Sequence, residues 1–163
     1  MIVVTGNAPR SGTSAMMRAL LEHYEPHSYL EQFPEYVAKE RNPEGYWDLK
    51  KEHVTSSDPI PTESGRVIKL WAPMFDRINV DDVHTLVYMQ RNDFVKQVDS
   101  IHATALAEGF TVDSDMIAKM FINQRNRTQE IFNNTHTIVV DMENFREDPS
   151  LFIDHIQEMV PCQ

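Results

Sequence analysis

Short apolar runs alternate along the chain with segments in which apolar residues recur every three to four positions. The apolar runs predict strands over residues 2–5, 27–30, 66–71, 83–89 and 136–141. The segments with helical spacing predict helices over residues 12–24, 94–109 and 113–132 and a last helix that begins at residue 149. Strands that alternate with helices favour a parallel sheet with helices on both faces. We therefore predict a three-layer α/β/α domain of the P-loop type, with a central parallel sheet of about four to five strands.

The ends of the predicted helices carry their own sequence signals. Pro26 ends the first helix, because proline disfavours helical geometry in the residue that precedes it. Asn92 or Asp93 can cap the second helix through its side-chain oxygen. Asp148 and Pro149 occupy the N-cap and the first position of the last helix, where these residue types are favoured.

Residues 31–65 show no clear periodicity. They are rich in proline and charged residues and contain an obvious turn, Asn42-Pro43-Glu44-Gly45. We predict that this stretch forms short helices and loops over an active site. A chain of 163 residues has the size of one domain, so residues 1–163 are predicted as a single unit.

The first predicted strand leads directly into a turn rich in glycine, proline and hydroxyl residues, and then into a helix. The turn is Gly6-Asn7-Ala8-Pro9-Arg10-Ser11-Gly12-Thr13-Ser14. Such a unit can hold a phosphate, because backbone N–H groups and the positive end of the helix dipole converge on the anion. The turn is not a Walker A loop, which requires a lysine directly after its second glycine. The cation here is Arg10, within the turn, which indicates a phosphate-bearing donor other than Mg-ATP.

A second candidate anion site follows the strand predicted over residues 83–89. Arg91 stands at the carboxyl end of this strand, and Ser100 lies about two turns into the next helix. A guanidinium and a hydroxyl can bind a phosphate through charge-assisted hydrogen bonds. Ligands of parallel α/β sheets bind beyond the carboxyl ends of the strands, where Asp141 also falls. Two anion sites at one sheet edge predict a ligand with two separate phosphate groups.

Composition and charge argue against several other functions. The chain carries 15 Lys and Arg against 25 Asp and Glu, a formal charge of −10, whereas nucleic-acid binding requires a basic face. The lone cysteine, Cys162, cannot form an internal disulfide, and the scattered histidines predict no metal site. The first strand starts at residue 2, which leaves no room for a signal peptide, and no apolar run approaches the length of a membrane span. We expect a cytoplasmic protein with neither a nucleic-acid nor a membrane partner.

Five segments together resemble the sulfotransferases that use 3′-phosphoadenosine 5′-phosphosulfate (PAPS), a P-loop family, and most of all their compact bacterial and phage-type members. The similarity covers nearly the whole chain, and it is the order and spacing of the segments that carry it. In chain order the segments are Pro9-Arg10-Ser11-Gly12-Thr13-Ser14, Asn42-Pro43-Glu44-Gly45-Tyr46-Trp47-Asp48, Val67-Ile68-Lys69-Leu70-Trp71-Ala72-Pro73, Arg91 with Ser100, and Val139-Val140-Asp141-Met142-Glu143-Asn144-Phe145 followed by Asp148-Pro149.

The resemblance implies roles for the matched residues. The residues that it implies for PAPS binding are Arg10, Ser11, Gly12, Thr13 and Ser14 at the 5′-phosphosulfate and Arg91 and Ser100 at the 3′-phosphate. In the family the serine usually comes one residue sooner after the arginine, so Asp99 and Ser100 are alternatives for this position. Larger members add a C-terminal Arg/Lys-Gly segment against the 3′-phosphate, and its absence here predicts weak binding. Lys69 either contacts the ligand or extends along its apolar strand to solvent.

The implied reaction is the in-line transfer of a sulfuryl group to a hydroxyl or amine of a small-molecule or glycan acceptor. Charge grows on the bridging oxygen of the leaving nucleotide, and Arg10 is the candidate to stabilise it. The sulfuryl group carries less charge than a terminal phosphate, so arginine and backbone donors can act without a metal ion. The acceptor needs a general base, for which Asp48 is the first candidate and Glu31 and His53 are the alternates.

Two other functions remain open from the sequence. A P-loop kinase or NTPase would use Asp141 as its metal ligand, although the Gly-Lys-Ser/Thr sequence that such an enzyme needs is missing. A catalytically inactive relative would bind the nucleotide without turning it over. Mg²⁺ dependence and ATP affinity separate the first alternative from a sulfotransferase, and turnover separates the second.

Overall fold

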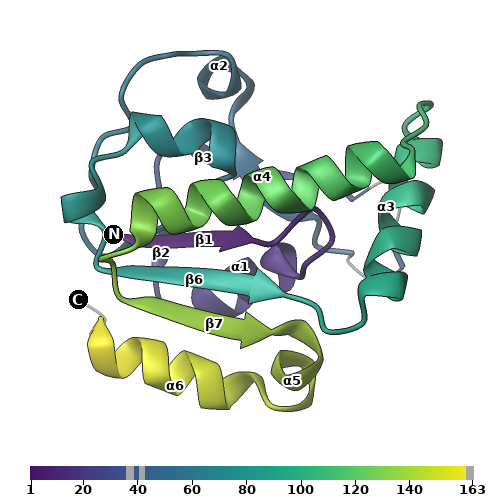
Figure 1. Cartoon of the computed structure of the whole chain (residues 1–163). Helices are drawn as coiled ribbons and strands as arrows, with labels where there is room; N and C mark the ends of the chain where they lie inside the picture. The colour runs from purple at the N-terminus through teal and green to yellow at the C-terminus, as the bar shows by residue number, and fades with distance from the viewer. Residues whose placement is uncertain (36–38, 41–42, 161–163) are drawn as a thin grey trace.

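A parallel sheet of five strands forms the centre of the structure, a computed structural model that describes residues 1–35, 39–40 and 43–160. Every pairing in this sheet is parallel, as the sequence predicted, and β1 lies in the middle (Figure 1). The strands, in the order in which they lie in the sheet, are β2 (Glu25–Pro26), β5 (Arg66–Lys69), β1 (Ile2–Gly6), β6 (Thr85–Gln90) and β7 (Thr137–Asp141).

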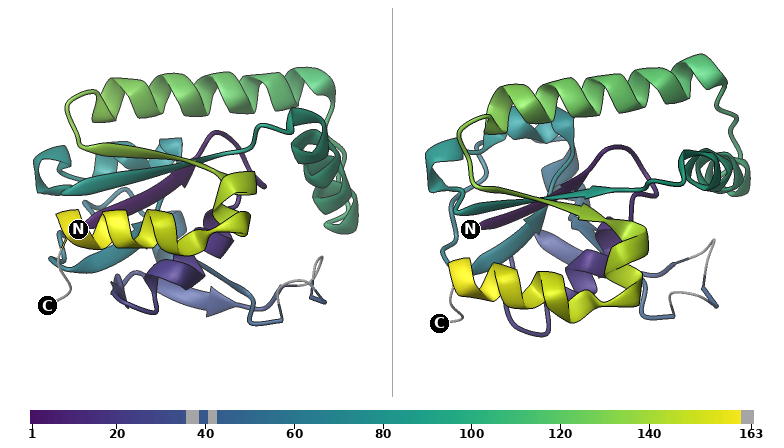
Figure 2. Two further views of the ribbon diagram at one scale, coloured as in Figure 1. Left: turned by 90° about the horizontal axis from the view of Figure 1, so that it is seen from below. Right: turned by 60° about the horizontal axis from the view of Figure 1, so that its bottom comes forward.

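Helices cover both faces of this sheet, which gives the three layers expected from the alternating pattern. α4 (Ser114–Phe132) and the 3-10 helix η1 (Ala72–Arg77) lie on one face. Three helices, α1 (Thr13–Leu20), α5 (Met142–Glu147) and α6 (Pro149–Met159), lie on the other (Figures 1 and 2). α3 (Phe94–Ala107) stands beyond the carboxyl end of β6, at the edge of the sheet. No described helix combines the length and the apolar character needed to cross a bilayer.

The core explains why the strand positions could be predicted. All five residues of β1 are buried, because helices cover this central strand on both faces and a continuous apolar run is then required. α1 buries Met16, Met17 and Leu20 against the sheet. The predicted helix starts also hold: Asp93 caps α3 by accepting from the backbone N of Lys96, and Asp148 caps α6 with Pro149 in its first turn.

The stretch of residues 31–65 is more ordered than the predicted short helices and loops. It contains most of an antiparallel pair, β3 (Leu30–Phe33) with β4 (Tyr46–Leu49), followed by the single-turn helix α2 (Lys51–Val54). The prediction missed this pair because only Leu30 and Leu49, which are paired in register, are buried, so there is little apolar signal. Of the turn predicted at 42–45, Asn42 lies outside the described residues, as does Cys162.

Further elements differ from the predictions. α1 ends at Leu20 rather than at residue 24, and the backbone N–H groups of Leu21 and Tyr24 close the end by donating to Met17 and Leu20 carbonyls. Of the strand predicted over 27–30, only Leu30 lies in a strand, as the first residue of β3, and β2 ends before it at Pro26. α5 was not predicted. It begins where the Asp141 carboxylate accepts from the backbone N–H groups of Glu143 and Asn144. The short 3-10 helix η2 (Val80–Asp82) also precedes β6.

Candidate anion-binding site

The carboxyl ends of β1 and β6 form a switch point of the sheet. The chain leaves β1 toward α1 on one face and leaves β6 toward α3 and α4, of which α4 covers the opposite face. The two strands are hydrogen-bonded neighbours, with Gly6 opposite Met89. Connections that diverge in this way leave a crevice at the strand ends, where ligands of open α/β sheets bind. Arg10 and Arg91 both lie just beyond this edge.

Residues 7–12, here called the β1–α1 loop, are held by close packing of their backbone. Arg10 adopts φ 66, a left-handed conformation that is unusual for a non-glycine residue and costs on the order of 1 kcal/mol. A Cβ atom at Gly6 would overlap the Ser11 side chain, and one at Gly12 would overlap Met142 Sδ. Gly12, with φ 100, is also the N-cap of α1 and has no side-chain cap. The packing therefore requires glycine at position 6, just before the loop, and at position 12, its last residue.

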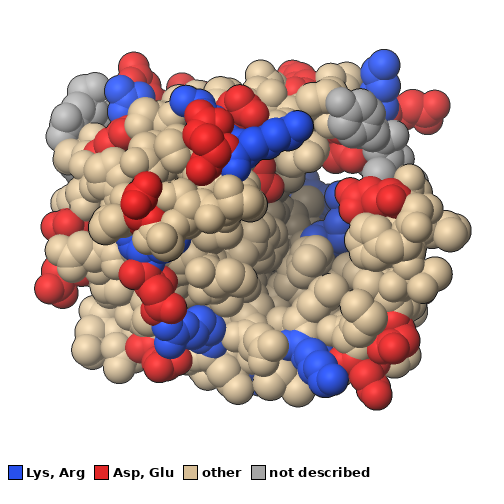
Figure 3. All heavy atoms as spheres, turned by 90° about the horizontal axis from the view of Figure 1, so that it is seen from above, with Lys and Arg blue, Asp and Glu red and all other residues tan. Residues whose placement is uncertain are grey.

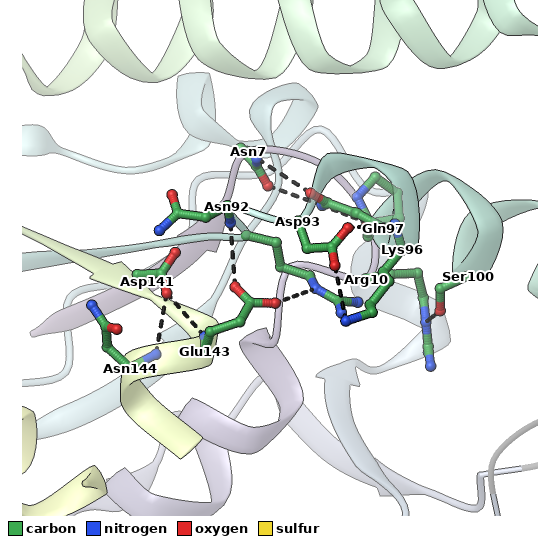
Figure 4. Close-up of polar contacts among 12 residues, drawn as sticks. Asn7, Arg10, Asn92, Asp93, Lys96, Gln97, Ser100, Asp141, Glu143 and Asn144 are labelled. Carbon is green, nitrogen blue, oxygen red and sulfur yellow. Dashed lines mark hydrogen bonds and ion pairs between the residues drawn. The ribbon is translucent and has the colours of Figure 1, made fainter. Parts of the chain in front are cut away.

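Gln97 of α3 fixes the loop from outside the sheet. Its side chain is fully buried, and its Nε2 atom donates to Asn7 Oδ1 and to the Pro9 carbonyl, each at 3.0 Å (Figure 4). Asn7 Nδ2 donates back to Gln97 Oε1 at 3.4 Å. Sequence analysis missed Gln97. The available signal was a polar residue four positions before Ile101, within the buried face of the helix.

Arg10 contacts Ser100, which the sequence analysis had placed with Arg91 at the second anion site. Arg10 Nε donates to Ser100 Oγ at 3.0 Å, whereas Asp99 is exposed to solvent (Figure 4). The structure therefore directs Ser100, and not Asp99, toward the β1–α1 loop. The Nη groups of Arg10 donate no hydrogen bond to any residue within the described part of the chain. They remain available for an anion.

The other predicted residues of the first site differ in exposure. Ser11 is fully buried, packed against Gly6, and its Oγ has no hydrogen-bond partner among the described residues. Its hydroxyl is therefore turned into the protein, so its backbone N–H is the group left for a ligand. Thr13 is buried in the first turn of α1, whereas Ser14 is half-buried.

Arg91 has a charged partner that sequence analysis missed. Its Nε donates to Glu143 Oε1 at 3.2 Å, and the backbone N of Asn92 donates to Glu143 Oε2, also at 3.2 Å (Figure 4 shows Asn92 and Glu143). Nearby Asp93 is engaged by Lys96, whose backbone N–H is the main cause of the lowered pKa of this carboxyl. Glu143 could have been found as the acidic residue two positions after the strand-end Asp141.

Asp48, the first candidate base, is paired with Lys69 at the end of β5. Lys69 Nζ lies 3.0 Å from Asp48 Oδ2 and over the Tyr46 ring, and Asp48 Oδ1 accepts from the backbone N of Leu49. Burial lowers the pKa of Lys69, against the opposing effect of the Asp48 charge. Lys69 is buried and does not extend to solvent. Of the two alternates, Glu31 of β3 pairs in register with Asp48 of β4. The His53 ring stacks on the ring of Tyr29.

Two hollows flank α4. The first, of about 630 Å³, shares Pro9 with the β1–α1 loop and is walled by η1 and α4, with Trp71, Pro73 and Met120 among its apolar residues. Figure 3 shows a hollow on this side of the molecule with Lys or Arg atoms in its wall. The second, of about 830 Å³, lies over β6 and β7 and includes Tyr88, whose pKa is raised by burial.

Asp141 is the remaining acidic residue at the strand ends. Its Oδ1 caps α5, and its Oδ2 is buried with no hydrogen-bond partner in the described part of the chain. Within residues 1–35, 39–40 and 43–160, no group of three or more His, Cys, Asp or Glu is placed to hold a metal ion. A scan against protein-family models, a search of curated proteins and a search of solved structures each found no match. A function must therefore be inferred from the site.

Proposed function

We propose that this protein is a sulfotransferase that moves a sulfuryl group from PAPS to a hydroxyl or amine acceptor. The observation that carries the proposal is the setting of Arg10. It lies at the switch point of the sheet, in a strained loop at the start of α1, its Nε bonded to the neutral Ser100 hydroxyl and its Nη groups unoccupied by described residues. A strained residue with free donors is suited to hold an anion in one orientation.

The proposed reaction uses the two ends of one nucleotide. The acceptor oxygen or nitrogen attacks the sulfur atom, the bond from sulfur to the bridging oxygen of the 5′-phosphate breaks, and its electron pair leaves with adenosine 3′,5′-bisphosphate. Arg10 would stabilise the charge on that oxygen, with backbone N–H groups of residues 11–14 as further donors. Arg91 would hold the 3′-phosphate.

The acceptor would occupy the hollow that shares Pro9 with the β1–α1 loop. Its wall combines the Trp71 and Met120 side chains with the amides of Asn123 and Asn126, a mixture that suits a molecule with both apolar and hydroxyl surfaces. Asp48 remains our candidate for the base that takes the acceptor proton, but it is not among the residues that line this hollow, so the acceptor group would have to extend beyond the hollow toward β4. Its ion pair with Lys69 would have to loosen for this role, because both carboxylate oxygens already accept hydrogen bonds.

Thermal stabilisation by nucleotides tests this proposal. We expect adenosine 3′,5′-bisphosphate to raise the melting temperature and Mg-ATP to raise it much less. Arg10→Ala and Arg91→Ala should each remove most of that rise, whereas Arg146→Ala, at an exposed arginine of α5, should leave it unchanged. With PAPS and an acceptor, Arg10→Ala should slow transfer by about 10²–10³-fold. Stabilisation by Mg-ATP alone would contradict the proposal.

One observation favours a second candidate, a kinase-like phosphotransferase. Asp141 Oδ2 is buried without a described partner, and the next residue, Met142, packs against Gly12 of the β1–α1 loop. A carboxylate oxygen in that position is suited to a divalent cation beside a bound phosphate. This candidate predicts that Mg²⁺ and ATP stabilise the protein together and that Asp141→Asn removes the Mg²⁺ dependence.

A further inference from the structure

We infer that Glu143 is a built-in competitor for the second phosphate and makes the Arg91 site selective for ligands whose anion can displace it. This inference rests on the proposed function. The two oxygens of the Glu143 carboxylate accept from two different donors, Arg91 Nε and the backbone N of Asn92, each at 3.2 Å. A guanidinium beside a backbone N–H is a donor pair that suits a phosphate oxyanion. The protein's own carboxylate occupies it.

Because Glu143 is negatively charged, its contact with Arg91 opposes the binding of a phosphate there. Asp93 already pairs with Lys96, so Arg91 is the cation that faces Glu143. A phosphate placed beside the intact ion pair would meet the Glu143 charge at close range, and like charges in such a position repel. Binding therefore requires that Glu143 moves away from Arg91.

Glu143 can move without disturbing the fold. Its side chain is 35% exposed, against 11% for Arg91, and it lies in the first turn of the short helix α5. That turn is capped by Asp141, and the Glu143 side chain has no part in the cap. The carboxylate can rotate into solvent, where water replaces the two donors.

The exchange of Glu143 for a phosphate determines which nucleotides bind through Arg91. A 3′-phosphate brings up to two charges and three oxygens and can replace the carboxylate, whereas a 3′-hydroxyl cannot. A nucleotide without the 3′-phosphate leaves the Arg91–Glu143 pair intact. Glu143 therefore lowers the affinity for the bisphosphate and leaves the affinity for a 5′-only nucleotide unchanged.

The test measures the affinities of two ligands, adenosine 3′,5′-bisphosphate and adenosine 5′-phosphosulfate, by calorimetry with the full chain. Glu143→Gln should bind the bisphosphate about tenfold more tightly, close to the upper end of what a partly exposed ion pair contributes. It should bind the phosphosulfate with less than about a twofold change. Glu147→Gln, which removes a charge from an exposed residue of the same helix, is the matched control and should change neither affinity by more than about twofold.

The other outcomes would overturn either the competitor role of Glu143 alone or the proposed function together with it. Equal gains for both ligands, or the same gain in Glu147→Gln, would show a general charge effect and end the competitor role. An unchanged bisphosphate affinity would do the same and leave the proposed function standing. If neither ligand binds to the wild type or to Glu143→Gln, the proposed function is overturned, and this inference with it. The melting temperature of each variant without ligand verifies that it is folded.

Discussion

Arg10 and Arg91 follow neighbouring strands of one sheet, yet the protein treats the two cations differently. Arg10 bonds a neutral hydroxyl and sits in a loop fixed by glycine packing and by the buried Gln97. Arg91 bonds the carboxylate of a residue that is 35% exposed. The first cation thus has fixed geometry and an unneutralised charge, whereas the second has its charge balanced by a side chain that can leave.

If the two arginines bind anions as proposed, this difference shows two ways in which an acidic chain can hold an anion. The formal charge is −10, so a cation gains little from the surrounding field. At the β1–α1 loop the compensation is structural, because donors held in place lose little entropy when an anion binds. At Arg91 the proposed compensation is an exchange of the Glu143 carboxylate for a phosphate. Three substitutions probe this contrast, in decreasing order of expected effect.

The largest effect should come from Gly6→Ala, which attacks the fixed geometry of the β1–α1 loop. The new Cβ would overlap the Ser11 side chain, and overpacking of this kind costs about 3 kcal/mol of unfolding free energy. Gly109→Ala is the matched control, because its Cβ would meet nothing within 4 Å and only its positive φ of 84 is strained. Its cost should be about 1 kcal/mol. Urea unfolding measures the free energy of unfolding of both variants. Equal losses would contradict the view that close packing at Gly6 holds the loop in place.

A smaller loss is expected for Gln97→Ala, which removes the bond to the Pro9 carbonyl. The Pro9 and Asn7 oxygens lose a buried donor, at a cost of about 2 kcal/mol. Hydrogen exchange should quicken at the amides of residues 7, 8 and 10–12 and stay the same at Asn92. Gln129→Ala, at an exposed glutamine of α4, should change neither quantity. Faster exchange at Asn92 as well would mean that the two sites are not held independently.

The smallest effect should come from Lys69→Met, as a change in how stability depends on pH in the alkaline range. The Lys69–Asp48 pair is a second ion pair at the strand ends, and its cation is more deeply buried than that of the Arg91–Glu143 pair. Burial lowers the pKa of Lys69 from its ordinary 10.5, so between the folded and ordinary values the unfolded chain holds a proton that the folded chain has released. The unfolding free energy of the wild type should therefore rise with pH as 10.5 is approached.

Lys69→Met should flatten that rise, because the group that titrates is gone. Lys119→Met, at an exposed lysine of α4, should keep the slope of the wild type. Chemical unfolding at a series of pH values from about 8 to 10 measures the slopes. If the unfolding free energy of the wild type rises no more steeply with pH than that of Lys69→Met, the pKa of Lys69 is not lowered.

Much of the fold could be predicted from the chain because the signals were local. The buried run of β1, the aspartates that cap α3 and α6, and Pro149 after Asp148 each act over a few residues. The positions of Arg10 and Arg91 beyond strand ends followed from the strand boundaries. These predictions required only periodicity and capping.

The misses have the opposite character. β3 and β4 bury one residue each, so their pairing leaves almost no apolar signal. Gln97 contacts residues 88 and 90 positions away, and Glu143 contacts residues 51 and 52 positions away. A polar side chain in a sequence does not reveal whether it faces water or a distant partner, so neither role could be predicted.

The sequence alone determined the alternation of strands and helices, the parallel sheet, and the placement of a guanidinium after each of two strands, because periodicity, capping and chain direction are properties of neighbouring residues. Only the tertiary structure decided the partners: Ser100 for Arg10 and not for Arg91, Glu143 for Arg91, and Asp48 for the buried Lys69. Those pairings arise when separate segments pack together, and the free energy of a charge depends on the atoms that packing brings beside it.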